Sequence, residues 1–355
     1  MAVAVFFLIV LFGARLAPNG KFFDDSFNAS HTRSLKGALA ICVILHHLCT
    51  YLSEAFPSLL FFEQLGFIAV GGFFLISGYG LCYGVTHKEN YLRGFFRKRL
   101  LRVLIPYYLI VPFHIIARLI AHTLTLPYVT DSLLGLSQWY IFAIAVMYIS
   151  FFVSFRIFGV KWGRVAVTVC AALYAVVLFV IYRRGIYCFG FWWYNSIICF
   201  PLGVWYCSVR EKVDPILKKR YFPILMFAVL AFIFSWRTAF GNYAEDSKRL
   251  YVLAFQTICA ALFSVMVVML SMKVQIGNRI LTFCGDHSLE MYLAHAPWIY
   301  FLQSGVTVSG HRIFVASPDY YITGIIAATV VTSVIVHKAA QWLHKKITAP
   351  NDTGR

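Results

Sequence analysis

The sequence predicts an all-α integral membrane protein, a polytopic bundle of about ten core transmembrane helices. Composition is the first observation, since 61% of the 355 residues are hydrophobic and only 13% are charged. A soluble domain of this size could not keep so much apolar surface from water. The second observation is a series of apolar runs close to 20 residues long, the length of helix that crosses ~30 Å of hydrocarbon.

These apolar runs define the predicted spans. They cover residues 36–55, 65–84, 103–122, 138–157, 164–182, 190–208, 221–237, 250–271, 287–304 and 320–337. An additional run, 3–16, precedes them, and this short segment either spans the membrane as an extra N-terminal helix or lies along its surface. The loops are short and no linker separates the runs. We therefore expect a single membrane domain over 1–355, with a leading segment at 1–30 and the ten-helix core at 31–340.

Charge predicts the orientation of the bundle. If the segment before the first core span is cytoplasmic and the sides alternate from there, 24 of the 31 Lys and Arg residues fall on the cytoplasmic side and 7 on the other. Cytoplasmic loops of membrane proteins carry such an excess. The C-terminus is then cytoplasmic. The net charge of +17 is attributed to loops that face the cytoplasm and anionic membrane lipids, and no nucleic-acid partner is expected.

Polar residues in the first core span are the first candidates for chemistry, because polar groups inside a bilayer are costly. Lys36 and His47 are eleven residues apart, close to three helical turns, so they share one face with Arg33. His47 would lie about 16 Å further along the helix, near mid-membrane. His46 is rotated by about 100° and is expected to face elsewhere. A plain hydrogen bond to a neighbouring helix stays open as the alternative role of His47.

A second polar group lies in the run SLEMYLAH near the C-terminus. Glu290 is the carboxylate that lies well inside a predicted span. His295 would sit about 12 Å in from the cytoplasmic end of its helix, at a depth comparable to that of His47. Two histidines at similar depth in different helices predict a shared polar site. The candidate catalytic residues are therefore His47, Lys36, His295 and Glu290.

Two further segments suggest ligand contacts. Arg99 and Arg102 are three residues apart and would share a helix face at the membrane surface, where arginine forks suit phosphate groups. Topology anchoring and lipid headgroups are the alternative role of this basic cluster. The second span is rich in glycine, which favours close helix packing, and Ser77 in that span is a candidate for lining a ligand path. No metal is predicted, because no CxxC occurs and no His pair four residues apart has a carboxylate nearby.

Four segments of the chain, in order, resemble the membrane acyltransferase-3 family. This family comprises transmembrane O-acyltransferases that modify bacterial cell-surface glycans and related substrates. The segments are RSLKGALAICVILHH, FFLISGYGL, RKRLLRVLIPY and SLEMYLAH. The resemblance implies an enzyme of the bacterial plasma membrane that transfers acyl groups other than amino-acyl groups. It also implies acyl-CoA, and acetyl-CoA above all, as the donor substrate.

The resemblance also implies roles for single residues. His47 matches the first-span histidine that is held to be catalytic in the family, and His295 matches the late histidine. Arg99 and Arg102 match the basic pair implicated in handling acyl-CoA. Lys36 stands where many members have Arg and another branch has Lys. His46 departs from the pattern, because Gly is common at its position, and this departure leaves the acceptor open.

The residues and the resemblance together predict a membrane-embedded acyltransferase that moves an acyl group from cytosolic acyl-CoA to a hydroxyl of a cell-surface or lipid-linked glycan. Neutral His47 either acts as general base on the acceptor hydroxyl or takes the acyl group itself. Lys36 or Arg33 would hold the thioester or a CoA phosphate. The alternative is a multi-pass transporter or flippase for a lipid-linked saccharide, which the scarcity of in-span carboxylates disfavours. A membrane scaffold would leave the two buried histidines unexplained.

Overall fold

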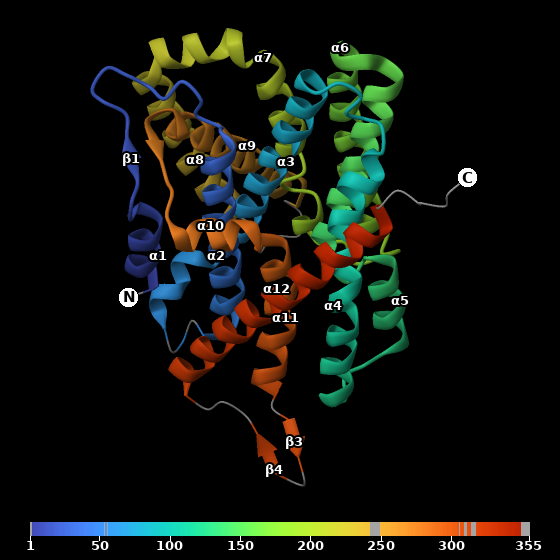
Figure 1. Cartoon of the computed structure of the whole chain (residues 1–355). Coiled ribbons are helices and arrows are strands. Elements are labelled where there is room, and N and C mark those ends of the chain that lie inside the picture. Colours follow the sequence, from blue (N-terminus) through green and yellow to red (C-terminus); the bar gives the residue numbers. More distant parts are fainter. Residues whose placement is uncertain are drawn as a thin grey trace.

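The computed structural model of the chain describes residues 2–52, 54, 56–241, 249–304, 306–308, 311–313 and 317–348, which form a helical bundle (Figure 1). Its α-helices are α1 (Ala2–Leu11), α2 (Ala29–Leu52), α3 (Gly66–His87), α4 (Leu101–Ile120), α5 (Leu126–Leu134), α6 (Trp139–Arg183), α7 (Cys199–Lys219), α8 (Tyr221–Gly241), α9 (Arg249–Lys273), α10 (Arg279–Asp286), α11 (Ser288–Ser304) and α12 (Pro318–Thr348). Three shorter helices are η1 (Pro57–Phe62) and η3 (Phe191–Trp193), which are of 3₁₀ type, and η2 (Phe96–Leu100), which is of π type. Two antiparallel ribbons pair β1 (Arg15–Leu16) with β2 (Val274–Gln275) and β3 (Val306–Val308) with β4 (His311–Ile313).

Every predicted span overlaps a helix of the structure. The spans 138–157 and 164–182 both fall in α6, which is interrupted at Gly159, where φ is 63° and ψ is −170°. Residue 55, the predicted end of the first span, lies outside the described residues. Within the part of the chain that the structure describes, six helical stretches are long and apolar enough to cross a membrane by themselves. The all-α membrane class is therefore confirmed, whereas the count of ten crossings is not.

Polarity and length explain why some predicted spans are not among these six helical stretches. Helix α2 carries Arg33, Lys36 and three histidines, and these polar side chains lower its hydropathy. Helix α11 has 17 residues, of which one is Glu290 and one is His295. The helices that are too short or too polar to count as membrane spans by themselves thus include α2 and α11, which carry the candidate catalytic residues.

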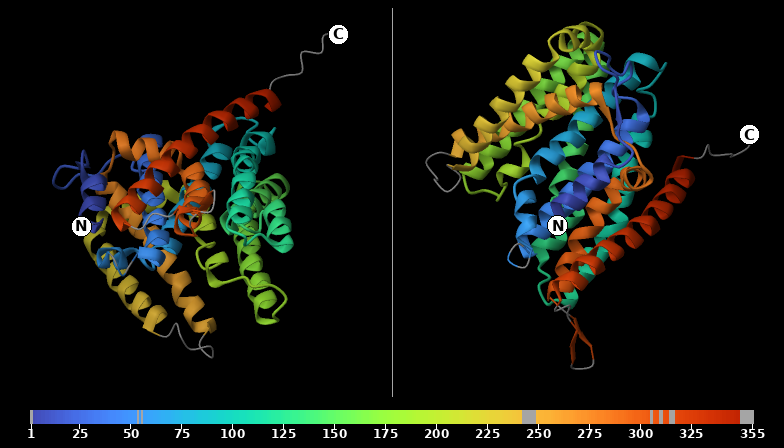
Figure 2. Two further views of the ribbon diagram at one scale, coloured as in Figure 1. Left: turned by 90° about the horizontal axis from the view of Figure 1, so that it is seen from below. Right: turned by 90° about the vertical axis from the view of Figure 1, so that its left-hand side faces the viewer.

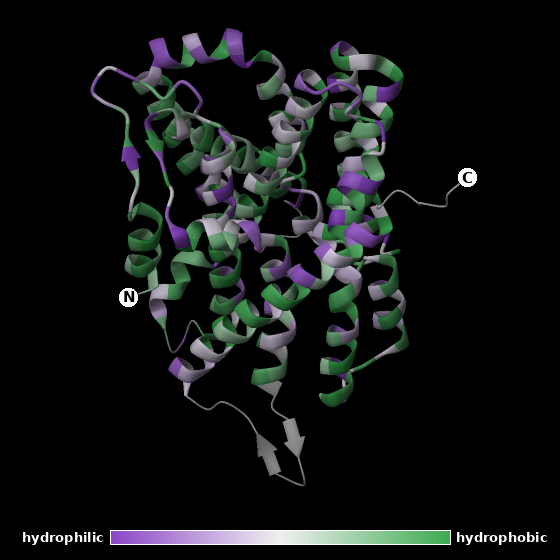
Figure 3. Ribbon diagram, in the orientation of Figure 1, coloured by the Kyte–Doolittle hydropathy of each residue, from purple (hydrophilic) through white to green (hydrophobic). Residues whose placement is uncertain are grey.

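The outward faces of the bundle are apolar. On α8 the side chains of Phe222, Phe227 and Leu230 are exposed, Phe222 to 76%. Figure 3 shows hydrophobic residues along the outer helices, and hydrophilic residues at the upper end and where α12 passes η2. Contiguous apolar surface of this extent is avoided by proteins in water. In a bilayer it faces acyl chains.

The N-terminal run forms a helix that is too short to cross the membrane alone. Helix α1 has ten residues and is therefore about 15 Å long, half the thickness of the hydrocarbon. It lies beside η1, where the rings of Phe6 and Phe62 are 5.4 Å apart. After α1 the chain turns into β1, which pairs with β2. Of the two alternatives for residues 3–16, the structure favours a segment that does not cross.

Helix α10 is an element that the span prediction missed, because its eight residues lie in a polar stretch. The Asn278 side chain caps it and accepts a hydrogen bond from the Leu281 N–H at 2.9 Å. The helix packs on α2 at backbone distance. Gly37 faces the Leu281 carbonyl and Gly285 faces the Arg33 carbonyl, so that a Cβ on either glycine would overlap a backbone oxygen. Because α11 begins at Ser288, directly after α10, this contact fixes where α11 starts relative to α2.

Helices α3 and α7 also approach at backbone distance. A Cβ on Gly78 would overlap the Phe200 carbonyl, and a Cβ on Gly203 would overlap the Leu75 carbonyl. The close packing predicted from the glycines of the second span is therefore confirmed at Gly78. Gly80, two residues later, faces open space.

Three of the connections that the charge pattern assigned to one side meet at one end of the bundle. Phe22, in the loop before α2, lies 5.9 Å from the Lys218 ammonium of α7 and 4.2 Å from the Lys273 ammonium of α9. Arg210 of α7 donates a hydrogen bond to the Tyr79 hydroxyl near the end of α3 at 2.8 Å. We call this the basic end. The β3–β4 hairpin projects from the opposite end (Figure 1; Figure 2, right). The compartment that each end faces stays a prediction.

The backbone contact between α3 and α7 gives a stability test. We expect Gly78→Ala to lower the unfolding temperature of the purified protein, since the added methyl group must displace α7. The cost of such overpacking is about 1–3 kcal/mol. Gly80→Ala on the same helix is the matched control and should leave the unfolding temperature unchanged or slightly higher. Equal unfolding temperatures for the two variants, measured by thermal unfolding in detergent, would contradict the packing.

Candidate active site

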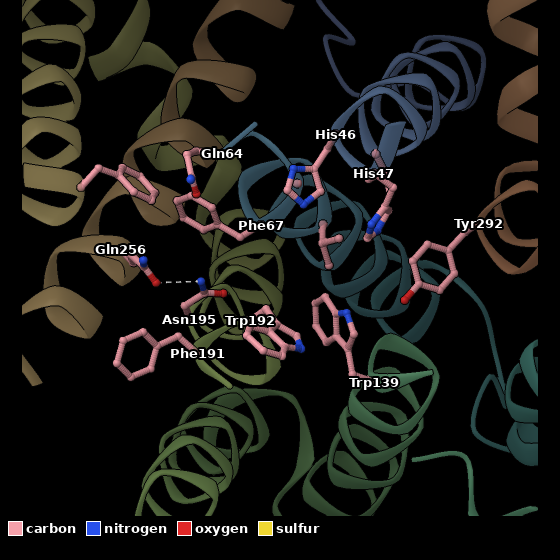
Figure 4. Close-up of a pocket in the computed structure, with 14 residues that line it drawn as sticks. His46, His47, Gln64, Phe67, Trp139, Phe191, Trp192, Asn195, Gln256 and Tyr292 are labelled. Carbon is pink, nitrogen blue, oxygen red and sulfur yellow. Dashed lines mark hydrogen bonds between the residues drawn. The ribbon is translucent and has the colours of Figure 1, made fainter. Parts of the chain in front are cut away.

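Three cavities lie in series through the bundle. The histidine cavity, of about 310 Å³, is lined by His46, His47, Phe67, Trp139, Asn195, Tyr292 and their neighbours (Figure 4). The middle cavity, of about 150 Å³, is lined by Lys36, Ser77, Tyr140, Tyr148, Ser288, Tyr292 and their neighbours. The basic cavity, of about 840 Å³, is lined by Lys36, Arg99, Arg102, Glu290, Lys338, Lys345 and their neighbours.

Shared wall residues connect the cavities. Val70 and Tyr292 line both the histidine cavity and the middle cavity. Lys36 and Tyr148 line both the middle cavity and the basic cavity. A path from the basic cavity to His47 therefore has wall residues in common at every step. The middle cavity is the smallest of the three.

His47 lies in the wall of the histidine cavity, as its helix stripe predicted for a site residue. His46 lines the same cavity, with ring centroids 4.9 Å apart, so the expectation that it faces elsewhere was wrong. The cavity is wide enough to border two adjacent positions of α2. Gly66 makes room for His46, because a Cβ there would overlap the ring. The Nδ1–H of His46 donates to the Phe62 carbonyl at 3.1 Å, which holds the ring against η1.

His295 lies directly behind His47, with ring centroids 4.9 Å apart. The sequence predicted that the two histidines lie at similar depth in the membrane, and in the structure their rings are neighbours. His295 is 2% exposed, and its Nδ1 lies 3.1 Å from the Met291 carbonyl. A carbonyl oxygen only accepts, so Nδ1 carries the proton and Nε2 of the neutral ring is left with its lone pair. Nε2 has no hydrogen-bond partner among the described residues.

Lys36 and Ser77 border the middle cavity. Lys36 stands at its junction with the basic cavity, near the charges of Asp286, Glu290 and Arg99. Along α2 it lies about 16 Å from His47, too far to act on the same atom. Of the two contacts predicted for Lys36, with a thioester or with a CoA phosphate, this position disfavours the thioester.

Arg99 and Arg102 both line the basic cavity, at the junction of η2 and α4. The Arg99 guanidinium lies 5.4 Å from the centroid of the Tyr91 ring. Burial raises the pKa of Tyr91 and the nearby Arg99 opposes that shift, so Tyr91 is a neutral platform for Arg99 at physiological pH. Helix α12 adds Lys338 and Lys345 to the same cavity. Sequence reasoning missed these two lysines because they lie more than 200 residues from Arg102.

Two candidate residues are engaged elsewhere. Glu290 lines the basic cavity, not the histidine cavity, and its Oε1 pairs with Nδ1 of His337 on α12 at 2.9 Å. Glu290 therefore lies apart from the two histidines, as its offset from His295 around the helix indicates, and its catalytic role stays a prediction. Arg33 lies outside the described lining of the three cavities, and its Nε pairs with Asp286 Oδ1 at 3.1 Å. That pair fastens α10 to α2.

The structure also brings in polar residues that the sequence reasoning passed over. Asn195 and Gln256 line the histidine cavity, and the Asn195 Nδ2 donates to Gln256 Oε1 at 3.0 Å. His114 of α4 lies 3.1 Å from the Leu293 carbonyl through its Nε2, which braces α11 two residues before His295. In the sequence, these residues could have been recognised as amide or imidazole side chains within apolar runs. Among the described residues no three His, Cys, Asp or Glu side chains gather closely enough to hold a metal, and the absence of a metal stays a prediction.

The arrangement suits group transfer between two different ligands. An imidazole that borders a cavity can take a proton from a hydroxyl brought within hydrogen-bond distance. A cavity with several Lys and Arg side chains suits a ligand that carries phosphates. The middle cavity would then admit only a narrow, flexible part of such a ligand toward His47.

Comparison with known proteins gives one match. The family model described as an acyltransferase domain, of the acyltransferase-3 type, matches residues 33–337. The matched range begins on α2 with Arg33 and ends on α12 with His337, so it includes every candidate site residue described above except Lys338 and Lys345. No curated protein and no solved structure matches the chain.

The Glu290–His337 pair gives a test of the site geometry. We expect His337→Ala to destabilise the protein by about 1–3 kcal/mol, because it leaves a buried carboxylate without its partner. Adding Glu290→Gln should recover part of that loss, since a neutral amide is easier to bury than a carboxylate. Thermal unfolding of the two single variants and the double variant gives the coupling. Strictly additive effects would mean that the pair does not join α11 to α12 in solution.

Proposed function

This chain is a membrane acyltransferase that belongs to the acyltransferase-3 family, and we propose that it moves an acyl group, acetyl above all, from cytosolic acyl-CoA to a hydroxyl of a cell-surface or lipid-linked glycan. The observation that carries the proposal is the connected series of cavities, with the basic cavity at one end and His47 at the other. A transporter would need neither a histidine pair at the closed end of such a path nor a phosphate-binding mouth.

The donor is assigned to the basic cavity. Acyl-CoA has phosphates at one end and the thioester at the end of a long, flexible arm. Arg99 and Arg102 would bind the phosphates through charge-assisted hydrogen bonds. Lys36, at the junction of the two cavities, would hold a phosphate or the start of the arm. The arm would then pass along Ser77 and between Val70 and Tyr292, so that the acyl carbonyl reaches His47.

The chemical step is assigned to His47 as general base. His47 takes the proton of the acceptor hydroxyl while the oxygen attacks the thioester carbonyl carbon. The carbon–sulfur bond then breaks, and the departing CoA sulfur takes the proton back from the His47 imidazolium. The products are the ester and free CoA, and the neutral imidazole is restored. The ring of His295 lies 4.9 Å from that of His47, and its Nε2 keeps a lone pair. His295 would therefore stabilise the transient imidazolium charge.

The sidedness of the reaction follows from the charge pattern. The basic end would face the cytoplasm of a bacterial cell, where acyl-CoA is made, and the C-terminus would lie on that side. The histidine cavity lies toward the other end, and the acceptor would enter from there. The acyl group would thus cross part of the membrane within the protein while CoA stays in the cytoplasm.

The first functional prediction concerns the choice of histidine. We expect His47→Ala to lower the rate of acyl transfer roughly 10²- to 10⁴-fold, the usual contribution of a general base, with normal insertion and folding. His46→Ala is the matched control on the neighbouring position and should lose much less activity, because its Nδ1 is committed to the Phe62 carbonyl. The assay is transfer of label from radiolabelled acetyl-CoA to glycan. Equal losses in the two variants would mean that His47 is not the base.

The second functional prediction concerns the donor. Arg99→Gln and Arg102→Gln should each raise the apparent Michaelis constant for acyl-CoA roughly tenfold to a hundredfold, since a charge-assisted hydrogen bond is worth about 1.5–3 kcal/mol. Arg→Lys should rescue only in part, because an ammonium cannot reproduce the guanidinium fork. Arg93→Gln in the same connection is the control. Calorimetry with a non-hydrolysable acyl-CoA analogue decides the matter, and unchanged affinity in both variants would return the pair to an anchoring role.

A further inference from the structure

The part of the histidine cavity away from the basic end has features that the donor does not explain. Its wall includes Trp192 and Phe191 of η3, Phe240 at the end of α8, and the amide pair Asn195 and Gln256. Figure 4 shows the two tryptophans on one side of the cavity, the histidines on the other, and the amide pair at one end. Nothing in the proposed donor path requires two tryptophans or two amides here.

The amide pair has hydrogen-bonding capacity that the protein does not use. Asn195 and Gln256 are each 3% exposed, and one hydrogen bond joins them. Asn195 Oδ1 has no partner among the described residues. Leaving a buried polar atom unsatisfied is costly, and such atoms in a cavity wall are commonly completed by a ligand. A ligand hydroxyl can both donate to the free oxygen and accept from the second N–H of an amide.

The aromatic side chains complement the other face of such a ligand. Trp192 is 48% exposed at the rim, and Gly190 lets the Trp192 ring fold over the backbone, because a Cβ at Gly190 would overlap that ring. A sugar ring has a flat face of C–H bonds that packs on an indole and an edge of hydroxyls that an amide can bind. One ring, not a chain, fits a volume of about 310 Å³, which is near the lower end for small-molecule sites.

The charges of the residues that line the histidine cavity indicate which class of sugar it can bind. Apart from the two histidines, no Lys, Arg, Asp or Glu is among the described residues that line this cavity. A charged sugar would be desolvated here without a counter-charge, which is unfavourable. The basic residues are instead in the basic cavity, on the far side of Tyr292.

We propose that this part of the histidine cavity is the acceptor site and that it takes an uncharged sugar ring, with Trp192 as the stacking platform and the Asn195–Gln256 pair as the reader of ring hydroxyls. The inference rests on the proposed function for the fate of the ligand, but the binding itself requires no acyl donor. With the ring held between Trp192 and Asn195, one of its hydroxyls lies on the side of His47.

Ligand binding to the purified protein without acyl-CoA tests the proposal. The probes are a panel of neutral methyl hexosides and N-acetylglucosamine, compared with glucuronate and with linear sorbitol, and the readout is ligand-induced thermal stabilisation. We expect at least one neutral ring to bind, and glucuronate and sorbitol to bind at least about tenfold more weakly. Failure of every neutral ring to bind, or tighter binding of glucuronate, would overturn the proposal.

Variants then locate the site. Asn195→Leu, Gln256→Met and Trp192→Ala should each weaken binding of the neutral ring about tenfold, the loss expected for one or two hydrogen bonds or a stacking contact. Trp162→Ala, at a 62% exposed tryptophan outside the cavity, is the matched control. Unchanged binding in the folded members of the first group would overturn the assignment.

The two proposals fail differently. Normal sugar binding without any transfer from acyl-CoA would sink the proposed function and leave the site standing. If acyl transfer occurs and its Michaelis constant for sugar is unchanged in Gln256→Met and Trp192→Ala, the proposed function stands and the proposed acceptor site is overturned.

Discussion

The backbone contact between α2 and α10 is the interaction on which the site depends. Gly37 and Gly285 remove the two side chains that would keep these helices apart, and the Arg33–Asp286 ion pair closes the end of the contact. Helix α11 leaves α10 at Ser288, so its path is set by where α10 lies. Seven residues later, about two helical turns, His295 arrives behind His47. A wider spacing of α2 and α10 would move the His295 ring away from the His47 ring.

The cost of burying polar groups in a membrane explains how the rest of the bundle is arranged around that pair. Three histidines of the site have one nitrogen bonded to a backbone carbonyl: His46 bonds the Phe62 carbonyl, His295 the Met291 carbonyl and His114 the Leu293 carbonyl. These bonds offset desolvation and fix ring orientation at the same time. The cations, which are costlier to bury, stay in the basic cavity. The division between a charged cavity and a neutral one is thus a consequence of solvation, and under the proposed function it would separate a phosphate-bearing donor from an uncharged acceptor.

Much of this could be predicted from local sequence. Apolar run length predicted where helices lie, and helical periodicity predicted that His47 is a site residue and that His295 is at a similar depth. What failed depends on tertiary contact. Helix α10 is too short and polar for a hydropathy pattern. The partner of Glu290, His337 on α12, is another such contact, because no local pattern in the sequence indicates that the two residues pair. His46 was judged by rotation about α2 alone, and the space that Gly66 leaves brings it into the same cavity.

The central claim is that donor and acceptor meet at His47 from opposite sides of the membrane. It is tested most directly in sealed proteoliposomes that contain the protein in both orientations, with labelled acetyl-CoA added outside only. A soluble glycoside that accepts label in detergent is either trapped inside the vesicles or added outside with the donor. We expect the trapped glycoside to be labelled and the external one to stay unlabelled, because with both ligands outside no protein molecule of either orientation can reach both. Labelling of the external glycoside in vesicles that stay sealed would contradict it.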